Sequence, residues 1–149
     1  MCIRDSGGAG RGFQGSSGVQ THMTNSRLTD PEILEQRFPV RLERFQLRRG
    51  SGGKGRWSGG DGLDREIRFL APMSVALLSG SRRVAPFGLA GGQAGALGMA
   101  WLREQGGSWQ KQHGCFEQRV QTGDCLWIAT PGGGGWGTEE GDETLNNGD

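Results

Sequence analysis

Glycine is the residue that most limits the folds open to this chain, because it makes up 30 of the 149 residues and gathers near positions 7–18, 50–62, 88–98 and 132–137. A glycine has no side chain to bury, and inside a regular element it is about 0.5–1 kcal/mol less favourable than alanine because it loses more backbone entropy on folding. The length of 149 residues suffices for one domain. Only 33% of the residues are hydrophobic, however. We therefore expect a loop-rich domain whose stability depends on contacts with neighbouring protein.

Helix-start signals occur just before residue 31. Thr29 or Asp30 is a candidate N-cap, and Pro31 fits the first helical position, followed by an acidic residue whose charge opposes the helix dipole. Pro39 disfavours helical geometry at the residue before it. The sequence therefore predicts one short helix over residues 31–37.

Short segments of alternating or continuous apolar residues predict strands. They cover residues 41–48, 63–70, 74–79 and 125–130, with weaker candidates at 99–103 and 118–120. Arg65 interrupts the alternation of the second segment, and the third, SVALLS, is apolar enough for a fully buried strand. Short strands between glycine-rich turns, with one small helix, are typical of a mainly β domain.

The charge balance excludes some classes of partner. The 17 basic and 16 acidic residues give a net charge of +1 without a concentrated basic face, so neither nucleic acid nor an anionic membrane is an expected partner. Apolar runs stay well short of the roughly 20 residues needed to span a bilayer, and a leader pattern is lacking, which predicts a cytoplasmic protein. Three cysteines do not make a disulfide framework.

Four blocks of sequence stand in the order and at the intervals of a known family. The blocks are THMTNSRLTDPEILEQRFPV at 21–40, RRGSGGKGRWSGGDG at 48–62, RRVAPFGLAGGQAGALG at 82–98 and TPGGGGWG at 130–137. Together they resemble the C-terminal end of the hydantoinase B/5-oxoprolinase family, with the greatest similarity to 5-oxoprolinase, over residues 7–137. Proteins of that family are several times longer. The resemblance thus implies a glycine-rich, loop-rich C-terminal fragment of a larger α+β enzyme.

The resemblance also implies an activity. It is that of an ATP-dependent amidohydrolase opening a cyclic amide such as 5-oxo-L-proline to L-glutamate, with ADP and phosphate as further products. Phosphorylation of the ring amide oxygen makes a poor electrophile reactive. ATP and Mg would be bound by an A-type subunit or domain, not by this segment. The segment would act with the remainder of the B-type region, in a homo-oligomeric enzyme, and be inactive alone.

Two alternatives stay open. One is another enzyme of the superfamily, either a hydantoinase of the N-methylhydantoinase type or an acetone-carboxylase-like B-type subunit. The other is a non-catalytic, β-rich interaction module. A module would fold alone, whereas a fragment would expose apolar surface around Trp57, Trp101, Trp109 and Trp127.

The resemblance and the composition together predict four regions. Residues 1–6, MCIRDS, do not match the family and resemble a non-native or scar-like start. Residues 7–20 have the composition of a flexible segment. Residues 21–137 form the family-like region, and the acidic residues 138–149 form a tail predicted to be disordered.

The pattern GxGxxG occurs three times, beginning at Gly10, Gly50 and Gly132. Bare backbone amides of such loops can cradle phosphate oxygens. Three matches in a chain so rich in glycine discriminate little, and the strand-loop-helix context of a nucleotide site is lacking. We therefore expect tight turns and close backbone packing here.

Some residues are candidates for chemistry. His22 can act as a general base, with Asn25 orienting it or binding a substrate carbonyl. Arg82 and Arg83 follow a predicted strand, where a guanidinium could bind the carboxylate of 5-oxoproline or a phosphate, or form a solvated or inter-subunit ion pair. The glycine run either packs against missing protein or lines the active site, and its candidate substrate-binding residues are Gly132, Gly133, Gly134 and Gly135.

A metal site is not expected. His113, Cys115 and Cys125 are suitable zinc ligands, but they lack the paired CxxC spacing that makes a zinc prediction specific. Asp61 and Asp64 are interpreted as turn and strand-surface residues rather than as a catalytic pair.

Overall fold

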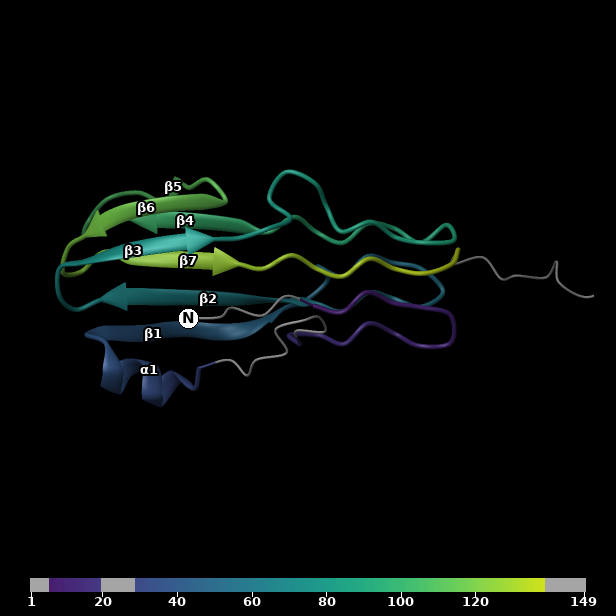
Figure 1. The fold of residues 1–149 in the computed structure, drawn as a ribbon, viewed down its shortest axis with the longest axis horizontal. Coiled ribbons are helices and arrows are strands. Elements are labelled where there is room, and N and C mark those ends of the chain that lie inside the picture. Colours follow the sequence, from purple (N-terminus) through teal and green to yellow (C-terminus); the bar gives the residue numbers. More distant parts are fainter. Residues whose placement is uncertain (1–5, 20–28, 139–149) are drawn as a thin grey trace, which may run out of the picture.

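The computed structural model describes residues 6–19 and 29–138 of the chain and is mainly β with one short helix, as predicted (Figure 1). The elements are α1 (Pro31–Arg37), β1 (Val40–Arg48), β2 (Gly62–Phe69), β3 (Met73–Leu78), β4 (Met99–Arg103), β5 (Gln110–Lys111), β6 (Cys115–Val120) and β7 (Cys125–Ala129). One antiparallel sheet has the strand order β1-β2-β7-β4-β5, and β3 pairs with β6 in a second, two-stranded sheet. Among these described elements, no helix is long and apolar enough to cross a bilayer.

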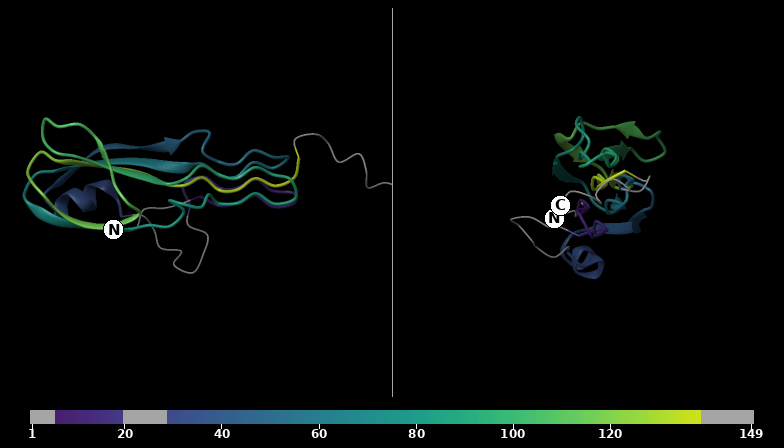
Figure 2. Two further views of the ribbon diagram at one scale, coloured as in Figure 1. Left: turned by 90° about the horizontal axis from the view of Figure 1, so that it is seen from above. Right: turned by 90° about the vertical axis from the view of Figure 1, so that its right-hand side faces the viewer.

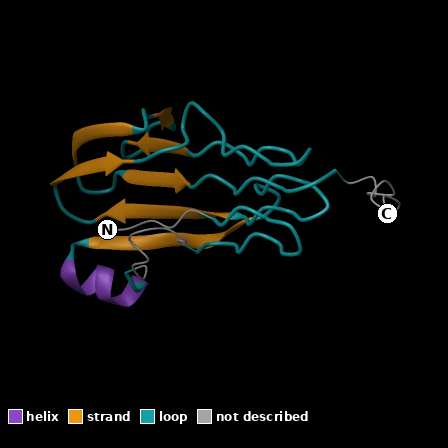
Figure 3. Ribbon diagram, turned by 45° about the vertical axis from the view of Figure 1, so that its right-hand side comes forward, coloured by secondary structure: helices purple, strands orange, loops and turns teal. Residues whose placement is uncertain are grey.

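The hydrophobic core lies where α1 and the two sheets meet (Figure 3). Leu34 of α1 packs in one cluster with Ile67 of β2 and Ile128 of β7, and the small sheet contributes Leu77 and Val120. Alternate residues of β2 are buried, since successive side chains of a strand point to opposite faces. The outer face of the large sheet is thereby left for polar and aromatic groups.

The helix begins and ends where the sequence predicts. The Asp30 side chain accepts a hydrogen bond from the backbone N–H of Glu32 at 2.9 Å, and Pro31 occupies the first turn. Phe38 has extended backbone angles, as expected for the residue before Pro39. Capping and proline rules therefore account for both ends of α1.

The small sheet differs from its prediction. The segment 74–79 was predicted to be a fully buried strand, but β3 alternates, and Leu78 is 86% exposed. The reason is that β3 pairs only with β6 and packs on the core through one face. The short strand β5 was not predicted, because its two residues carry no apolar pattern.

Beyond one end of the sheet, the glycine-rich stretches run side by side as extended segments, visible as the wavy chains on the right of Figure 1 and in the left panel of Figure 2. We call this unit the glycine bundle. Its central segment is 131–137, and the segments hydrogen-bonded to it are 7–10, 51–62 and 86–97. The bundle continues the sheet, since β7 leads directly into the central segment.

Most of the hydrogen bonds that hold the central segment in place join backbone groups. Gly133 N–H donates to the Gly60 carbonyl, Gly135 N–H to that of Gln93 and Trp136 N–H to that of Trp57, at 2.8–2.9 Å. Residues 131–135 are all buried. A Cβ added at residue 132, 133, 134 or 135 would overlap backbone atoms of the surrounding segments. Glycine is therefore required here because the segments approach backbone to backbone.

The surrounding glycines recur with a period of three. Gly92, Gly95 and Gly98 face the central segment in turn, at positions 135, 132 and 131. Three residues per turn is the period of the polyproline II helix, which forms no internal hydrogen bonds and so needs partners outside itself. The bundle supplies these partners between segments.

Residues 7–19 form backbone hydrogen bonds with one another and with the bundle. Their composition predicts flexibility, yet Gly7 donates to Ser16, Gly15 donates to Ser58, and Ala9 donates to Gly134, all at 2.8–2.9 Å. Packing of these glycines against the bundle accounts for the difference. Composition reports on the segment taken alone and carries no information about its contacts with other segments.

The tryptophans are half-buried rather than freely exposed. Trp101 and Trp127 stack on the outer face of the large sheet with ring centroids 4.4 Å apart, and Trp109 meets Trp127 edge-on. The Trp127 indole N–H donates to Asp64 at 3.3 Å, which confirms Asp64 as a strand-surface residue. Trp57 forms a backbone bridge with Trp136 in the bundle. The apolar surface expected of a fragment is thus partly covered in the described chain.

We expect Asp124→Ala to lower the free energy of unfolding by about 2 kcal/mol, since two backbone N–H groups in partly buried hydrogen bonds lose their acceptor. Asp124 is buried in the turn before β7, and its carboxylate accepts from the N–H of Gln121 at 2.8 Å and of Gln105 at 3.0 Å. Urea unfolding would measure the change. Glu117→Ala, at an exposed position of β6, is the control and should stay within about 0.5 kcal/mol. Equal effects of the two substitutions would contradict the assignment.

Candidate functional site

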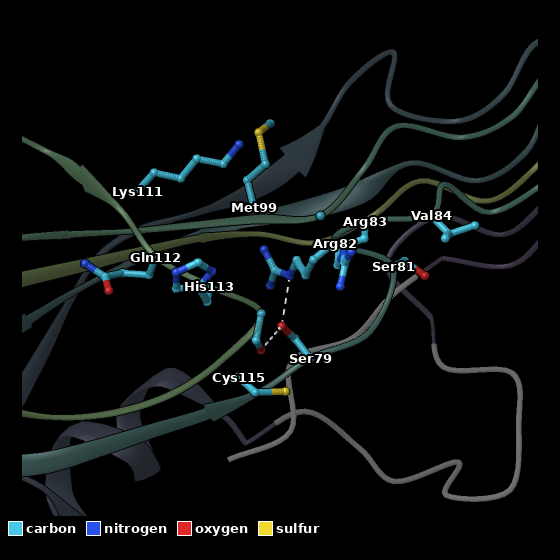
Figure 4. Close-up of a pocket in the computed structure, with 12 residues that line it drawn as sticks. Ser79, Ser81, Arg82, Arg83, Val84, Met99, Lys111, Gln112, His113 and Cys115 are labelled. Carbon is cyan, nitrogen blue, oxygen red and sulfur yellow. Dashed lines mark hydrogen bonds between the residues drawn. The ribbon is translucent and has the colours of Figure 1, made fainter.

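A pocket of about 570 Å³ opens where the sheets meet the glycine bundle (Figure 4). Such a volume suits a small-molecule ligand. Four parts of the chain line it: the end of β3, the start of a bundle segment, the start of β4 and the loop from β5 to β6. The lining residues are Ser79, Ser81, Arg82, Arg83, Val84, Gly98, Met99, Lys111, Gln112, His113, Gly114 and Cys115.

Arg82 is fixed in the wall of this pocket. Its Nε donates to Ser79 Oγ at 2.9 Å, and that hydroxyl donates to the Gly114 carbonyl at 2.6 Å (Figure 4). A Cβ at Gly98 would lie 3.1 Å from Arg82 Nε, and one at Gly114 would lie 2.7 Å from Arg82 Cγ. Two glycines therefore make the slot in which the arginine lies. Ser81 turns the chain there with a φ of 52°, which is unusual for a residue other than glycine.

The charge of the pocket is of one sign. Arg82, Arg83 and Lys111 are cationic, whereas the lining includes no Asp or Glu. Arg83 and Lys111 are exposed, and neither forms a salt bridge with a described residue. Guanidinium and ammonium groups bind carboxylates and phosphates through charge-assisted hydrogen bonds. The pocket is thus chemically suited to a small anion.

The structure places the predicted site residues in different regions. Arg82 and Arg83 lie together at the pocket, but the four glycines at 132–135 lie inside the bundle and not in the pocket lining. The substrate-binding roles of both groups stay predictions. His22 and Asn25 lie outside the described residues. Sequence reasoning missed Lys111, which reaches the pocket from β5, because no local motif connects it to the arginines.

The described residues include neither a metal cluster nor a glycine loop with its amides fully open to a phosphate. Within residues 6–19 and 29–138, no group of three His, Cys, Asp or Glu side chains could hold a metal. Several amides of the GxGxxG patterns are already used, since Gly53 donates to Gly133 and Gly15 to Ser58 at 2.8 Å. Gly52 N–H donates to the Asp61 carboxylate at 2.9 Å, and Asp61 lies in the loop directly before β2 rather than in an assigned turn. Close backbone packing at the GxGxxG patterns is therefore what the structure shows.

Comparison with known proteins gives consistent matches. The family model described as hydantoinase B/oxoprolinase matches residues 1–139. The 5-oxoprolinase 1 of Arabidopsis thaliana is 51% identical over 131 residues, which are 88% of this chain and 10% of that protein. The 5-oxoprolinase of Dictyostelium discoideum is 41% identical over 133 residues, which are 89% of this chain and 10% of that protein. The chain thus spans about a tenth of the length of these relatives.

A solved structure shares the fold. The ATP-dependent caprolactamase from Pseudomonas jessenii superposes with a TM-score of 0.74 at 24% sequence identity. The match covers 91% of this chain and 25% of that chain. The sheets and the bundle together therefore correspond to one region of a larger protein.

Proposed function

Because the chain belongs to the hydantoinase B/oxoprolinase family, we propose that it is the C-terminal part of an ATP-dependent cyclic-amide hydrolase whose substrate is 5-oxo-L-proline. The overall reaction is 5-oxo-L-proline, ATP and water to L-glutamate, ADP and phosphate. The identity to two 5-oxoprolinases supports the choice of substrate. It is a choice about the whole enzyme, of which this chain covers about a tenth.

The observation that carries the proposal is the cationic pocket. Its lining combines Arg82, Arg83 and Lys111 without a carboxylate, and 5-oxo-L-proline carries a carboxylate at neutral pH. Arg82 is held by Ser79 and the pocket backbone, whereas Arg83 and Lys111 are exposed at the opening. In this proposal the fixed arginine shapes the site, and the other two cations bind the anionic group of the substrate.

The proposal divides the work between this chain and the rest of the enzyme. The amides of Gly132, Gly133 and Gly135 are bonded to backbone, and the described residues form no metal cluster. We therefore assign ATP and Mg to an A-type subunit or domain, with the remainder of the B-type region completing the active site. The contribution of this chain is to bind and orient the substrate.

The test is an assay of the full-length enzyme containing this chain. We expect ATP hydrolysis to depend on 5-oxo-L-proline and to release L-glutamate and ADP in equal amounts. Preferential turnover of N-methylhydantoin, or ATP use coupled to carboxylation of a ketone, would favour the alternative enzymes instead. If the 149-residue chain were the complete product of its gene and none of these substrates were turned over, the interaction-module alternative would replace the enzyme.

A further inference from the structure

The Arg65 side chain is buried in β2 without a polar partner. The residue is 0% exposed, and Nε, Nη1 and Nη2 form no hydrogen bond with any described residue. Its cross-strand neighbours are Phe45 of β1 and Ile128 of β7, neither of which has an acceptor in its side chain. The guanidinium carbon lies 5.8 Å from the centre of the Phe45 ring, a cation–π contact that leaves the N–H donors unused.

Acidic residues next to Arg65 in the chain cannot serve as its counterion. Asp64 and Glu66 occupy the opposite face of β2, because side chains alternate along a strand. Asp64 accepts from the Trp127 indole, and Glu66 lies 3.7–3.9 Å from two other arginines, Arg44 and Arg103. Burial lowers the pKa of Arg65 from its ordinary value, but arginine remains protonated in proteins. A complete cation is thus enclosed on the core side of the sheet.

A buried charge is stable only when an opposite charge and hydrogen-bond acceptors accompany it. The planar guanidinium fork matches a carboxylate through two parallel hydrogen bonds. The three unpartnered nitrogens of Arg65 therefore call for an anionic partner with two acceptor oxygens in one plane, as in a carboxylate.

We propose that Arg65 is the receptor for a carboxylate side chain supplied by the part of the enzyme outside these 149 residues. The inference rests on the proposed function only in taking this chain as one part of a longer enzyme, consistent with its covering about a tenth of its relatives. Arg65 is absent from the lining of the cationic pocket. Its nitrogens are also shielded from solvent, so a carboxylate that folds together with the chain reaches them more readily than a diffusing substrate.

The test compares variants of the full-length enzyme. Arg65→Met keeps a similar length and removes the charge, while Arg65→Lys keeps the charge and removes the fork. Arg68→Met is the matched control, because Arg68 also lies in β2 but is exposed and pairs with Glu43 at 2.7 Å. We expect Arg65→Met to lower Tm by about 5 °C or more relative to Arg68→Met, because it leaves a buried carboxylate unpaired. Arg65→Lys should fall between Arg65→Met and the wild type.

Other results would overturn the proposal. If the Tm of Arg65→Met equals or exceeds that of the wild type, no buried carboxylate pairs with Arg65 in the full-length enzyme. An unchanged Tm with a tenfold rise in KM assigns the carboxylate to the substrate. If Arg65→Met cannot be recovered in folded form, the Arg65→Lys variant provides the test. If Arg65→Lys is also not recovered, the loss of side-chain shape rather than of charge is the cause, and the proposal fails. The Tm comparison does not depend on which cyclic amide the enzyme uses, so its failure is distinct from failure of the proposed function.

Discussion

Replacing Gly132 by alanine is expected to lower the free energy of unfolding by about 3 kcal/mol or more, because a single methyl group must displace backbone. The added Cβ would overlap the carbonyl group of Ser51. A flexible side chain could move aside, but Ser51 is buried, and its carbonyl accepts from Ala96 N–H at 2.7 Å. Relieving the overlap would therefore disturb the hydrogen bonds of two neighbouring segments.

The same reasoning predicts a comparable loss for Gly134→Ala, whose Cβ would overlap the Phe87 carbonyl group from another side of the bundle. Gly80→Ala is the control, since a Cβ at Gly80 has no atom within 4 Å and its φ is not positive. That variant should change stability by less than about 1 kcal/mol.

Urea unfolding followed by tryptophan fluorescence measures the effect, with Trp57 and Trp136 reporting from within the bundle. If Gly132→Ala and Gly80→Ala were equally stable, the backbone contacts of the bundle could not be as close as the structure shows.

The parts of the fold that obey local rules could be predicted from the sequence. Asp30 and Pro31 set the start of α1, and apolar alternation located β2. The glycine bundle was not predictable in the same way, because its contacts join residues far apart, such as Gly133 with Gly7 and Gly60. The extended segments of the bundle show no apolar periodicity, since what they bury is backbone. Their glycine spacing was visible, but it was interpreted as turns, close packing and a flexible start.

In the candidate site, too, some features follow from local sequence and others depend on long-range contacts. Arg82 and Arg83 were recognisable as basic residues after a strand, and both lie at the pocket. The slot around Arg82 depends on Gly98 and Gly114, which have no sequence relation to it. Arg65 was noticed only as an interruption of a strand pattern. Places where local sequence rules fail are expected to be functional or strained sites, and Arg65 is such a place.

In the full-length enzyme, Arg83→Ala is expected to raise KM for 5-oxo-L-proline about 10- to 100-fold, because the substrate loses one charge-assisted hydrogen bond. Arg83 is exposed at the pocket opening and has no salt bridge to a described residue, so its removal should leave the fold intact. Arg119→Ala, at an exposed position of β6 outside the pocket lining, is the control. Equal KM values for the two variants would remove Arg83 from the binding site.

A second substrate separates the two anions that this pocket could bind. The lactam 2-pyrrolidone has the ring of 5-oxoproline but lacks the carboxylate. If Arg83 binds the substrate carboxylate, Arg83→Ala should leave KM for 2-pyrrolidone unchanged while raising it for 5-oxo-L-proline. If the arginine instead stabilises a phosphate that develops during the reaction, kcat should fall by a similar factor for both lactams. The ratio of the two effects therefore identifies which oxygen atoms the cationic pocket binds.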